Sequence, residues 1–294
     1  MTRSTAVAVI GAGRVATAFA ARLERAGHHV VAASGRESSR DRVQRLLTRA
    51  RFYQFDQANE AAEIAEVVLI GVPDDLIADV CSQLAARGSF HRGQHVLHLS
   101  GSVGLDALSS ALPSGSEILS LHPLQSFPDA DQGIVRLPGS AVAVTARDEE
   151  GFAYGEALAR DVGGKPFRLA DEVKPLYHAA AVFASNYLVA VEGMAEHLFR
   201  LAGLDDALRF FEPLARTALD ATFAMGPGDA LTGPAARGDA GTIDRNLAAL
   251  AERAPEAVPA YVALATVAAD LAVRRGRLTA EGRARVEEAL RAWS

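Results

Sequence analysis

The sequence is poor in the residues that indicate disulfide bonds, thiolate metal sites or nucleic-acid binding. Cys81 is the single cysteine among 294 residues, which excludes an intrachain disulfide, a Cys-rich zinc site and a CxxC redox pair. Acidic side chains outnumber basic ones by 36 to 30, giving a formal net charge of −6, and no basic run is present that would track a phosphate backbone. We therefore expect a protein of a reducing compartment without a nucleic-acid partner.

Long apolar runs are also lacking. The longest uninterrupted one, Ala179 to Ala184, is far shorter than the roughly 20 residues that a helix needs to span a bilayer. No apolar signal segment precedes the first expected strand. We therefore expect a cytoplasmic protein with no membrane partner.

The stretch TAVAVIGAGRVATAF at residues 5–19 has the pattern of a strand, a glycine turn and a helix. Its GAGRVA segment fits the dinucleotide-binding fingerprint G-x-G-x-x-A, in which Gly11 allows a tight turn and Gly13 lets a phosphate approach the backbone. Free N–H groups in the first helical turn, at Arg14 and Val15, would hold the pyrophosphate. A tight strand-to-helix turn without a ligand is the alternative.

Apolar residues make up 49% of the chain, which suits about two domains with a sizeable core. Up to residue 170, short apolar segments alternate with helical patterns, and this alternation predicts a mostly parallel sheet. Long helical stretches dominate after it. The sequence thus predicts an α/β fold, with a Rossmann-type doubly wound domain over residues 1–170 and an all-α domain over residues 171–294.

The residues after the second expected strand, His29 to Ala33, would meet the adenosine ribose in such a fold. An acidic residue there is typical of NAD enzymes, whereas this chain has Ser34 and Arg36, with Arg40 soon after. Hydroxyl and guanidinium groups suit a 2′-phosphate. The pattern predicts NADP(H) rather than NAD(H), with solvated arginines as the alternative.

Further strand ends bring polar or turn-forming residues to the sheet edge where α/β proteins bind ligands. Val72 and Pro73 would turn the chain next to the cofactor, and Asp74 would cap the following helix. Ser100 would hold a substrate or carboxamide oxygen, or cap the helix after it. His122 follows another strand and is a candidate for lining the active-site cleft, with a structural histidine as the alternative.

The second domain opens with a helical pattern of nearly thirty residues that ends at Gly203. Lys174, His178 and Ser185 share one face, because steps of four and seven residues return to nearly the same angle. Asn186 lies on the flank of that face. We expect this face to line a cleft, with Lys174, His178 and Asn186 as candidate catalytic residues. A solvated Lys174 and a core His178 are the alternatives.

A turn-rich segment, Leu231 to Asp239, lies between later helices and has no apolar period that packing would explain. Arg237, presented with Thr232, is a candidate for clamping a substrate carboxylate. Asp239 would orient that guanidinium or cap the next helix. An exposed interhelical loop is the alternative.

The sequence gives no reason to expect a metal, since His95 and His98 would face opposite sides of one strand. The apolar content of the C-terminal helices is large for a domain of about 120 residues. A homodimer would bury this surplus apolar surface, and we expect one.

Five motifs, GAGRVA, SGSVG, LHPLQSF, YHAAAVFASNY and LTGPAARGD, together resemble a bacterial family that pairs a Rossmann-like domain with a helical C-terminal domain of formerly unknown function. That family is similar in architecture to pyrroline-5-carboxylate reductase, ketopantoate reductase and the 6-phosphogluconate dehydrogenase group. The resemblance implies a C-terminal domain like that of 6-phosphogluconate dehydrogenase, and a homodimer with the active site between the domains. In the 3-hydroxyacid branch a helix carries Lys followed by Asn four residues later. Here His178 follows Lys174 at that spacing, so that pair does not transfer intact.

The resemblance and the candidate residues together predict an NADP-dependent oxidoreductase that transfers a hydride to a small carbonyl substrate bearing a carboxylate. His178 or Lys174 would donate the proton, and Arg237 would hold the carboxylate. The residues expected to polarise the carbonyl or position the substrate are Ser100, His122 and Asn186. Ketopantoate is the first expected substrate. An imine reductase of the pyrroline-5-carboxylate type and a non-catalytic NADP-binding sensor are the alternatives.

Overall fold

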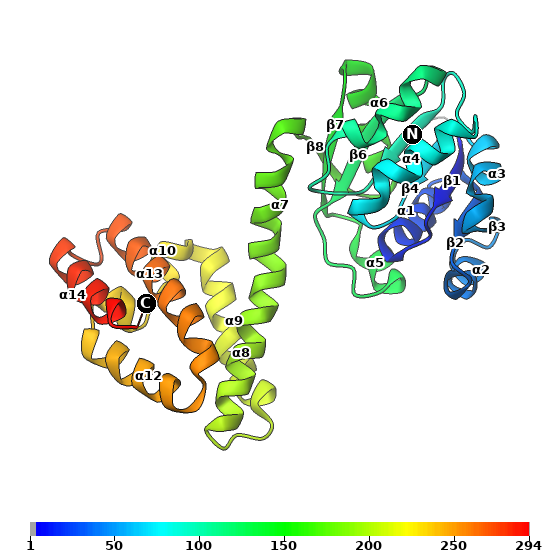
Figure 1. Cartoon of the computed structure of the whole chain (residues 1–294). Helices are drawn as coiled ribbons and strands as arrows, with labels where there is room; N and C mark the ends of the chain where they lie inside the picture. The colour runs from blue at the N-terminus through cyan, green and yellow to red at the C-terminus, as the bar shows by residue number, and fades with distance from the viewer. Residues whose placement is uncertain (1–3, 294) are drawn as a thin grey trace. The chain divides into compact units, whose positions relative to one another are not determined.

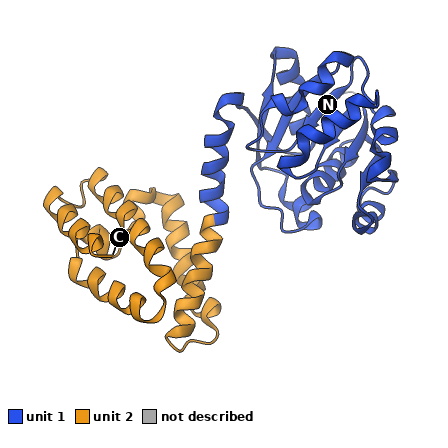
Figure 2. Ribbon diagram, viewed as in Figure 1, with its two compact units in different colours: residues 1–186 blue, residues 187–294 orange. Residues whose placement is uncertain are grey.

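A computed structural model describes residues 4–293 of the chain. The chain forms two compact units, Met1–Asn186 and Tyr187–Ser294, coloured blue and orange in Figure 2. The sequence analysis places the domain boundary near residue 170, just after the last strand. The first compact unit continues to Asn186 because the helix that follows is tied to the sheet domain by hydrogen bonds from Lys174 and Tyr177.

An eight-stranded sheet forms the centre of the first unit (Figure 1). The strands are β1 (Ala6–Ile10), β2 (His29–Gly35), β3 (Arg51–Gln54), β4 (Val67–Ile70), β5 (His95–His98), β6 (Glu117–Pro123), β7 (Ala141–Ala146) and β8 (Lys165–Arg168). Their order is β3-β2-β1-β4-β5-β6-β7-β8, and all neighbours are parallel except β6 and β7. The order reverses between β1 and β4, where doubly wound folds bind their ligands. The predicted Rossmann-type sheet is confirmed.

Alternate side chains of the strands pack into two helical layers, one on each face of the sheet. In β1, Val7 and Val9 join one core cluster with Phe19, whereas Ala8 and Ile10 join the other. Burial on both faces explains why the strand sequences are apolar without alternation. The helices of this unit before its last strand are α1 (Arg14–Arg25), α2 (Arg40–Leu46), α3 (Ala58–Glu63), α4 (Ile77–Ala86), α5 (Ala130–Arg136) and α6 (Glu149–Asp161). Short 3-10 helices lie between them, namely η1 (Glu37–Ser39), η2 (Phe55–Gln57), η3 (Asp74–Leu76), η4 (Leu105–Ser114) and, after β8, η5 (Asp171–Val173).

The first unit differs from the prediction in three places. The sequence analysis does not anticipate α5, although Asp129 caps it by accepting a hydrogen bond from the backbone of Gln132. Strand β6 continues through His122 and Pro123, because both residues pair with β7. The segment expected to be an ordinary helix after Ser100 is the 3-10 helix η4.

The long helix expected after Asp171 is interrupted by one wider turn. It consists of α7 (Lys174–Val182), the π-helical turn η6 (Phe183–Tyr187) and α8 (Leu188–Leu201). A π turn inserts one residue into the helical repeat and rotates every later side chain relative to the earlier ones, and such turns are frequent at functional sites. The face shared by Lys174 and Ser185 in an ideal helix is therefore broken.

The second unit is helical throughout its described part, which confirms the predicted fold class. After α8 it contains α9 (Ala207–Met225), α10 (Pro227–Ala230), α11 (Pro234–Arg237), α12 (Ala240–Arg253), η7 (Pro255–Ala257), α13 (Val258–Arg274) and α14 (Ala280–Arg291). Its core cluster is built by side chains such as Ile243, Leu247 and Val286, from α12 and α14, with alanines of α13. Helices α8 and α9 contribute no member to this buried cluster and keep large apolar side chains exposed.

One helical stretch, Pro255–Arg274, is long and apolar enough to cross a bilayer by length and composition alone. This stretch contains no long uninterrupted apolar run, because polar residues such as Asp270 separate its apolar residues. Core helices of soluble proteins meet the same criteria, and Ala265, Ala269 and Ala272 of this stretch are buried in the second unit. The stretch is therefore weak evidence for a membrane span.

Candidate active site

The glycine turn, Gly11 to Gly13, lies at the switch point of the sheet and depends on the absence of side chains. Gly11 has a φ of +86°, and a Cβ there would lie 2.6 Å from Val72 Cγ1. A Cβ on Gly71 would lie 2.3 Å from Ala16 Cβ and 2.7 Å from the Gly11 oxygen. The turn is held to β2, because the backbone N–H groups of Gly11 and Ala12 both donate to the Ser34 carbonyl, at 3.0 and 2.9 Å.

A cavity of about 310 Å³, here called the dinucleotide cavity, opens beside this turn. Its lining comes from the start of α1, the end of β4 and the segments after β2 and β5, and includes Gly13, Arg14, Val15, Ala16, Arg36, Gly71, Val72, Pro73, Asp74 and Ser100. Helix α1 has no side-chain cap and no acidic residue in its first turn. The backbone amides of its first turn fit a pyrophosphate.

The structure brings most of the predicted cofactor-binding residues together around this cavity, with two exceptions. Ser34 is buried behind the glycine turn, where its carbonyl supports Gly11 rather than lining the cavity. Arg40 is bound to Glu37, an acidic residue that the sequence analysis overlooks. Arg36 lines the cavity and has no ion pair within the described part of the chain.

A second cavity of the first unit, of about 830 Å³ and here called the polar cavity, adjoins the first, since Val15 lines both. Its walls come from the end of β6, the loop after it, α7 and η6. The polar side chains that line it are His122, Gln125, Ser126, Tyr177, His178, Ser185 and Asn186. The structure thus brings three predicted site residues, His122, His178 and Asn186, to one cavity.

His122 occupies the back of the polar cavity as a neutral imidazole. Gly101 makes room for its ring, because a Cβ on that glycine would lie 2.8 Å from His122 Cε1. His122 Nδ1 and the Tyr177 hydroxyl share a hydrogen bond of 2.9 Å. Burial, together with the nearby His178 and Lys174, lowers the pKa of His122 to about 4, although Asp74 acts in the opposite direction. The imidazole is therefore uncharged at neutral pH.

Tyr177 is a site residue that sequence reasoning misses. Its burial raises the pKa of the phenol to about 12, so the hydroxyl remains a proton donor at neutral pH. The ring of the neighbouring His178 lies 6.0 Å from that of His122, and His178 Nδ1 is buried without a hydrogen-bond partner in residues 4–293. Its position three residues after Lys174 could have indicated it, because residues three apart lie on neighbouring parts of one helix face.

Lys174 does not line the polar cavity, which corrects its predicted place beside His178. The side chain is only 1% exposed, and Nζ donates to the Ser100 carbonyl at 3.0 Å and to Ser120 Oγ at 2.8 Å. Burial lowers the pKa of Lys174 to about 8, although Asp171 and Asp74 act in the opposite direction. The ammonium therefore joins the segment after β5 to the middle of β6 instead of facing a substrate, and it is not a solvated lysine either.

Asp74 is not the helix cap that the sequence analysis favours. One of its oxygens accepts hydrogen bonds from Ser100 Oγ at 2.6 Å and from Ser102 Oγ at 2.8 Å. Ser100 Oγ also accepts from the backbone amides of Ser102 and Val103. Ser100 lines the dinucleotide cavity, and its hydroxyl is already hydrogen-bonded to neighbouring protein groups. The N-cap residue of the next helix, η4, is Gly104 and not Ser100.

Thr232, Arg237 and Asp239 belong to the second unit and line neither cavity of the first. Asp239 caps α12 by accepting from the Thr242 amide at 3.1 Å and from Thr242 Oγ1 at 2.8 Å. Thr232 and Arg237 are exposed. Across residues 4–293, no group of three or more His, Cys, Asp or Glu side chains is placed to hold a metal ion.

Comparisons with known proteins agree with this architecture. Residues 2–123 match the family model of the Rossmann-like domain, and residues 140–268 match a domain of unknown function, DUF2520. No curated protein matches the chain by sequence.

Several solved structures share the fold across nearly the whole chain. A Bacteroides fragilis protein assigned as an NADP oxidoreductase is 22% identical with a TM-score of 0.76, covering 91% of this chain and 98% of its own. An imine reductase from Myxococcus stipitatus bound to NADP+ is 16% identical with a TM-score of 0.65, covering 98% and 99%. A pyrroline-5-carboxylate reductase from Coxiella burnetii is 16% identical with a TM-score of 0.55, covering 92% and 98%. The chain therefore joins a Rossmann-like domain to a DUF2520 domain, in a fold shared with these reductases.

Proposed function

We propose that the protein is an NADPH-dependent reductase of a C=O or C=N bond in a small organic substrate. The observation that carries this proposal is the pair of adjoining cavities, with the dinucleotide cavity at the glycine turn and a polar cavity that holds a protonated phenol and a neutral imidazole. Val15 lines both. Fold neighbours that bind NADP+ support the cofactor class.

The residues of the dinucleotide cavity fit NADP(H), which supplies a hydride when bound. The first-turn amides of α1, from Arg14 and Val15, would hold the pyrophosphate. Arg36, which follows β2 and lines the cavity, is the cation that we propose for a 2′-phosphate. Val72 and Pro73 shape the wall at the end of β4.

In the polar cavity we assign proton donation to Tyr177. If His122 carries its proton on Nδ1, it donates to the Tyr177 oxygen and leaves the phenolic O–H free to protonate the substrate atom that gains electrons. The same hydrogen bond stabilises the phenolate that forms. His178, with an unpaired Nδ1, and Asn186 would orient the substrate or polarise its reacting bond. Lys174 lies outside the cavity lining and binds Ser100, after β5, and Ser120, within β6.

Ketopantoate, a 2-oxo acid, is the first substrate that we propose. We propose Arg237, with Thr232, as the group that binds its carboxylate. A cyclic imine of the pyrroline type is the second candidate, because the imine reductase fold covers 98% of this chain. A sensor that binds NADP without turnover would need the dinucleotide cavity but not Tyr177.

The test is NADPH oxidation by the purified full-length protein with ketopantoate, other 2-oxo acids and 1-pyrroline-type imines, with NADH in parallel. We expect turnover of at least one substrate class, with NADPH preferred. NADPH binding without turnover of any substrate would favour the sensor, and a protein that binds no dinucleotide would contradict the proposal at its first step.

A further inference from the structure

The turn after β2 packs against the glycine turn, and a hydrogen bond from Arg42 joins the two. From α2, Arg42 donates to the Ala12 carbonyl and to Ser39 Oγ. Gly35 allows this close packing, because a Cβ there would lie 3.3 Å from Ser39 Cβ and 3.6 Å from the Ala12 nitrogen. The 3-10 helix η1, which begins at Glu37, is thus fixed at the edge of the sheet where the ribose end of a dinucleotide lies in this fold.

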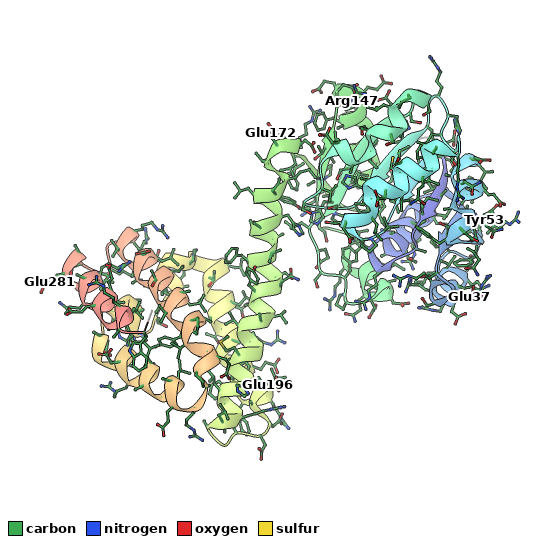
Figure 3. All side chains as sticks on the ribbon, in the orientation of Figure 1. Glu37, Tyr53, Arg147, Glu172, Glu196 and Glu281 are labelled. Carbon is green, nitrogen blue, oxygen red and sulfur yellow. The ribbon has the colours of Figure 1, made fainter. Side chains whose placement is uncertain are left out.

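Glu37 is held by two side chains at this edge, and we call Glu37, Arg40 and Gln54 the Glu37 cluster (Figure 3 labels Glu37). Arg40 binds both carboxylate oxygens, with Nε 2.5 Å from Oε1 and Nη2 3.1 Å from Oε2. Gln54, at the end of β3, donates its side-chain amide to Oε2. The guanidinium also lies over the Phe52 ring, 4.5 Å from its centre. Arg40 and, to a smaller extent, Gln54 lower the pKa of Glu37, so the carboxylate is ionised at neutral pH.

The cluster combines features that have opposite effects on cofactor choice. A carboxylate after β2 accepts hydrogen bonds from the ribose hydroxyls of NAD and repels a 2′-phosphate, whereas a guanidinium attracts that phosphate. This chain places Arg36 and Glu37 side by side. Arg36 lines the dinucleotide cavity, whereas the Glu37 carboxylate is occupied by Arg40 and Gln54.

We propose that Arg40 and Gln54 mask Glu37, and that this masking makes the protein prefer NADPH to NADH. The proposal rests on the proposed function only in requiring that the chain bind a nicotinamide dinucleotide. Arg36 then acts as the cation for the 2′-phosphate, and Arg40 acts through Glu37. Removal of Arg40 would expose the Glu37 carboxylate, which could then accept hydrogen bonds from the ribose hydroxyls.

The test is the dissociation constant of NADPH and of NADH, measured by fluorescence titration of the full-length protein. Arg40→Met keeps a stem that packs on Phe52 and removes the charge. We expect it to weaken NADPH binding about tenfold, because an unmasked carboxylate repels the phosphate, and to strengthen NADH binding severalfold. Arg40→Met combined with Glu37→Gln is expected to recover NADPH affinity to within about threefold of wild type. Arg45→Met, on the same helix and paired with Asp131, is the matched control and leaves both constants unchanged.

The double variant separates the proposal from direct binding of phosphate by Arg40. If Arg40 touches the phosphate itself, NADPH affinity stays low in the double variant, and the proposal is wrong. An unchanged ratio of the two constants in Arg40→Met also contradicts it, while leaving the proposed function intact. A wild-type protein that binds neither dinucleotide overturns the proposed function and this inference together.

Discussion

At the scale of single residues, three groups in or behind the polar cavity have different protonation states at neutral pH. Tyr177 keeps its proton up to a pKa of about 12, and His122 is neutral above a pKa of about 4. Lys174 is charged but sealed from solvent. Of the three, the phenol combines access to the cavity with a transferable proton. We therefore propose Tyr177 as the general acid.

We expect Tyr177→Phe to lower kcat by about a hundredfold or more, because general-acid groups contribute about 10² to 10⁴ in rate. The dissociation constant of NADPH is expected to remain unchanged. Tyr154→Phe is the matched control, since Tyr154 stacks on His95 and lies outside the polar cavity. Steady-state kinetics on the substrate found in the panel measures both variants, and equal kcat values for them would remove Tyr177 from the mechanism.

Lys174 gives a pH-dependent prediction for stability. In the unfolded chain its ammonium loses a proton near the ordinary value of 10.5, whereas in the folded protein the pKa is about 8. Between these values the unfolded state binds more protons, so the contribution of Lys174 to the free energy of unfolding increases as pH rises, by up to about 3 kcal/mol.

Urea unfolding of wild type and Lys174→Met at pH 7 and at pH 9.5 tests this. The wild type is expected to gain stability relative to the variant at the higher pH. A difference between the two proteins that is independent of pH would mean that the folded lysine has an ordinary pKa. The comparison with Lys174→Met cancels the titration of other groups that both proteins share.

The predictability of the site differs from residue to residue for a physical reason. The position of His122 could be predicted because an apolar run followed by His-Pro indicates the carboxyl edge of a sheet without reference to distant parts of the chain. Asn186 lies inside the π turn, which helix periodicity does not anticipate. The burial of Lys174 could not be predicted, because periodicity gives the face of a helix and not the element that covers it. The pairing of Tyr177 with His122 joins residues 55 positions apart and needs the fold.

At the scale of elements, the glycine turn depends on three backbone segments that touch. A methyl group at Gly71 would lie 2.3 Å from Ala16 Cβ and 2.7 Å from the Gly11 oxygen, so α1 or the glycine turn would have to shift. We expect Gly71→Ala to reduce the free energy of unfolding by about 3 kcal/mol and to weaken NADPH binding. Gly193→Ala, in α8 with open space around it, is the control and should be neutral or stabilising.

Urea unfolding and NADPH titration measure both glycine variants. A Gly71→Ala protein with wild-type stability and affinity would show that the turn can accommodate a methyl group at this position.

Burial also explains which elements can be predicted from the sequence. β1 (Ala6–Ile10) lies at the start of the stretch predicted as strand, turn and helix, because its apolar run is buried on both faces. The π turn η6 adds one residue to the helical repeat, and no residue pattern in the sequence indicates it, so it could not be predicted.

At the scale of the whole molecule, the second unit exposes large apolar side chains along α8 and α9, and neighbouring exposed apolar side chains are typical of interaction surfaces. The exposed fraction is 70% for Val189 on α8, and 69% and 82% for Leu214 and Phe223 on α9. A groove of about 560 Å³ between these two helices is lined by apolar side chains that include Leu188, Phe211 and Leu219. None of these side chains belongs to the buried core of α11–α14. Phe211 is buried and stacks on Phe199, whereas the others remain exposed or partly exposed and available for contact with another chain.

We therefore predict a homodimer in which a second copy covers the α8 and α9 face. Light scattering after size exclusion should give twice the chain mass of 30.9 kDa, and Leu214→Asp should shift the protein toward the monomer, because a carboxylate in an apolar interface lacks a partner. Val135→Asp is the control, since Val135 on α5 is 76% exposed in the other unit. A monomeric wild type would show that no second copy covers this face. A dimer that both variants leave intact would show that the dimer forms through another surface.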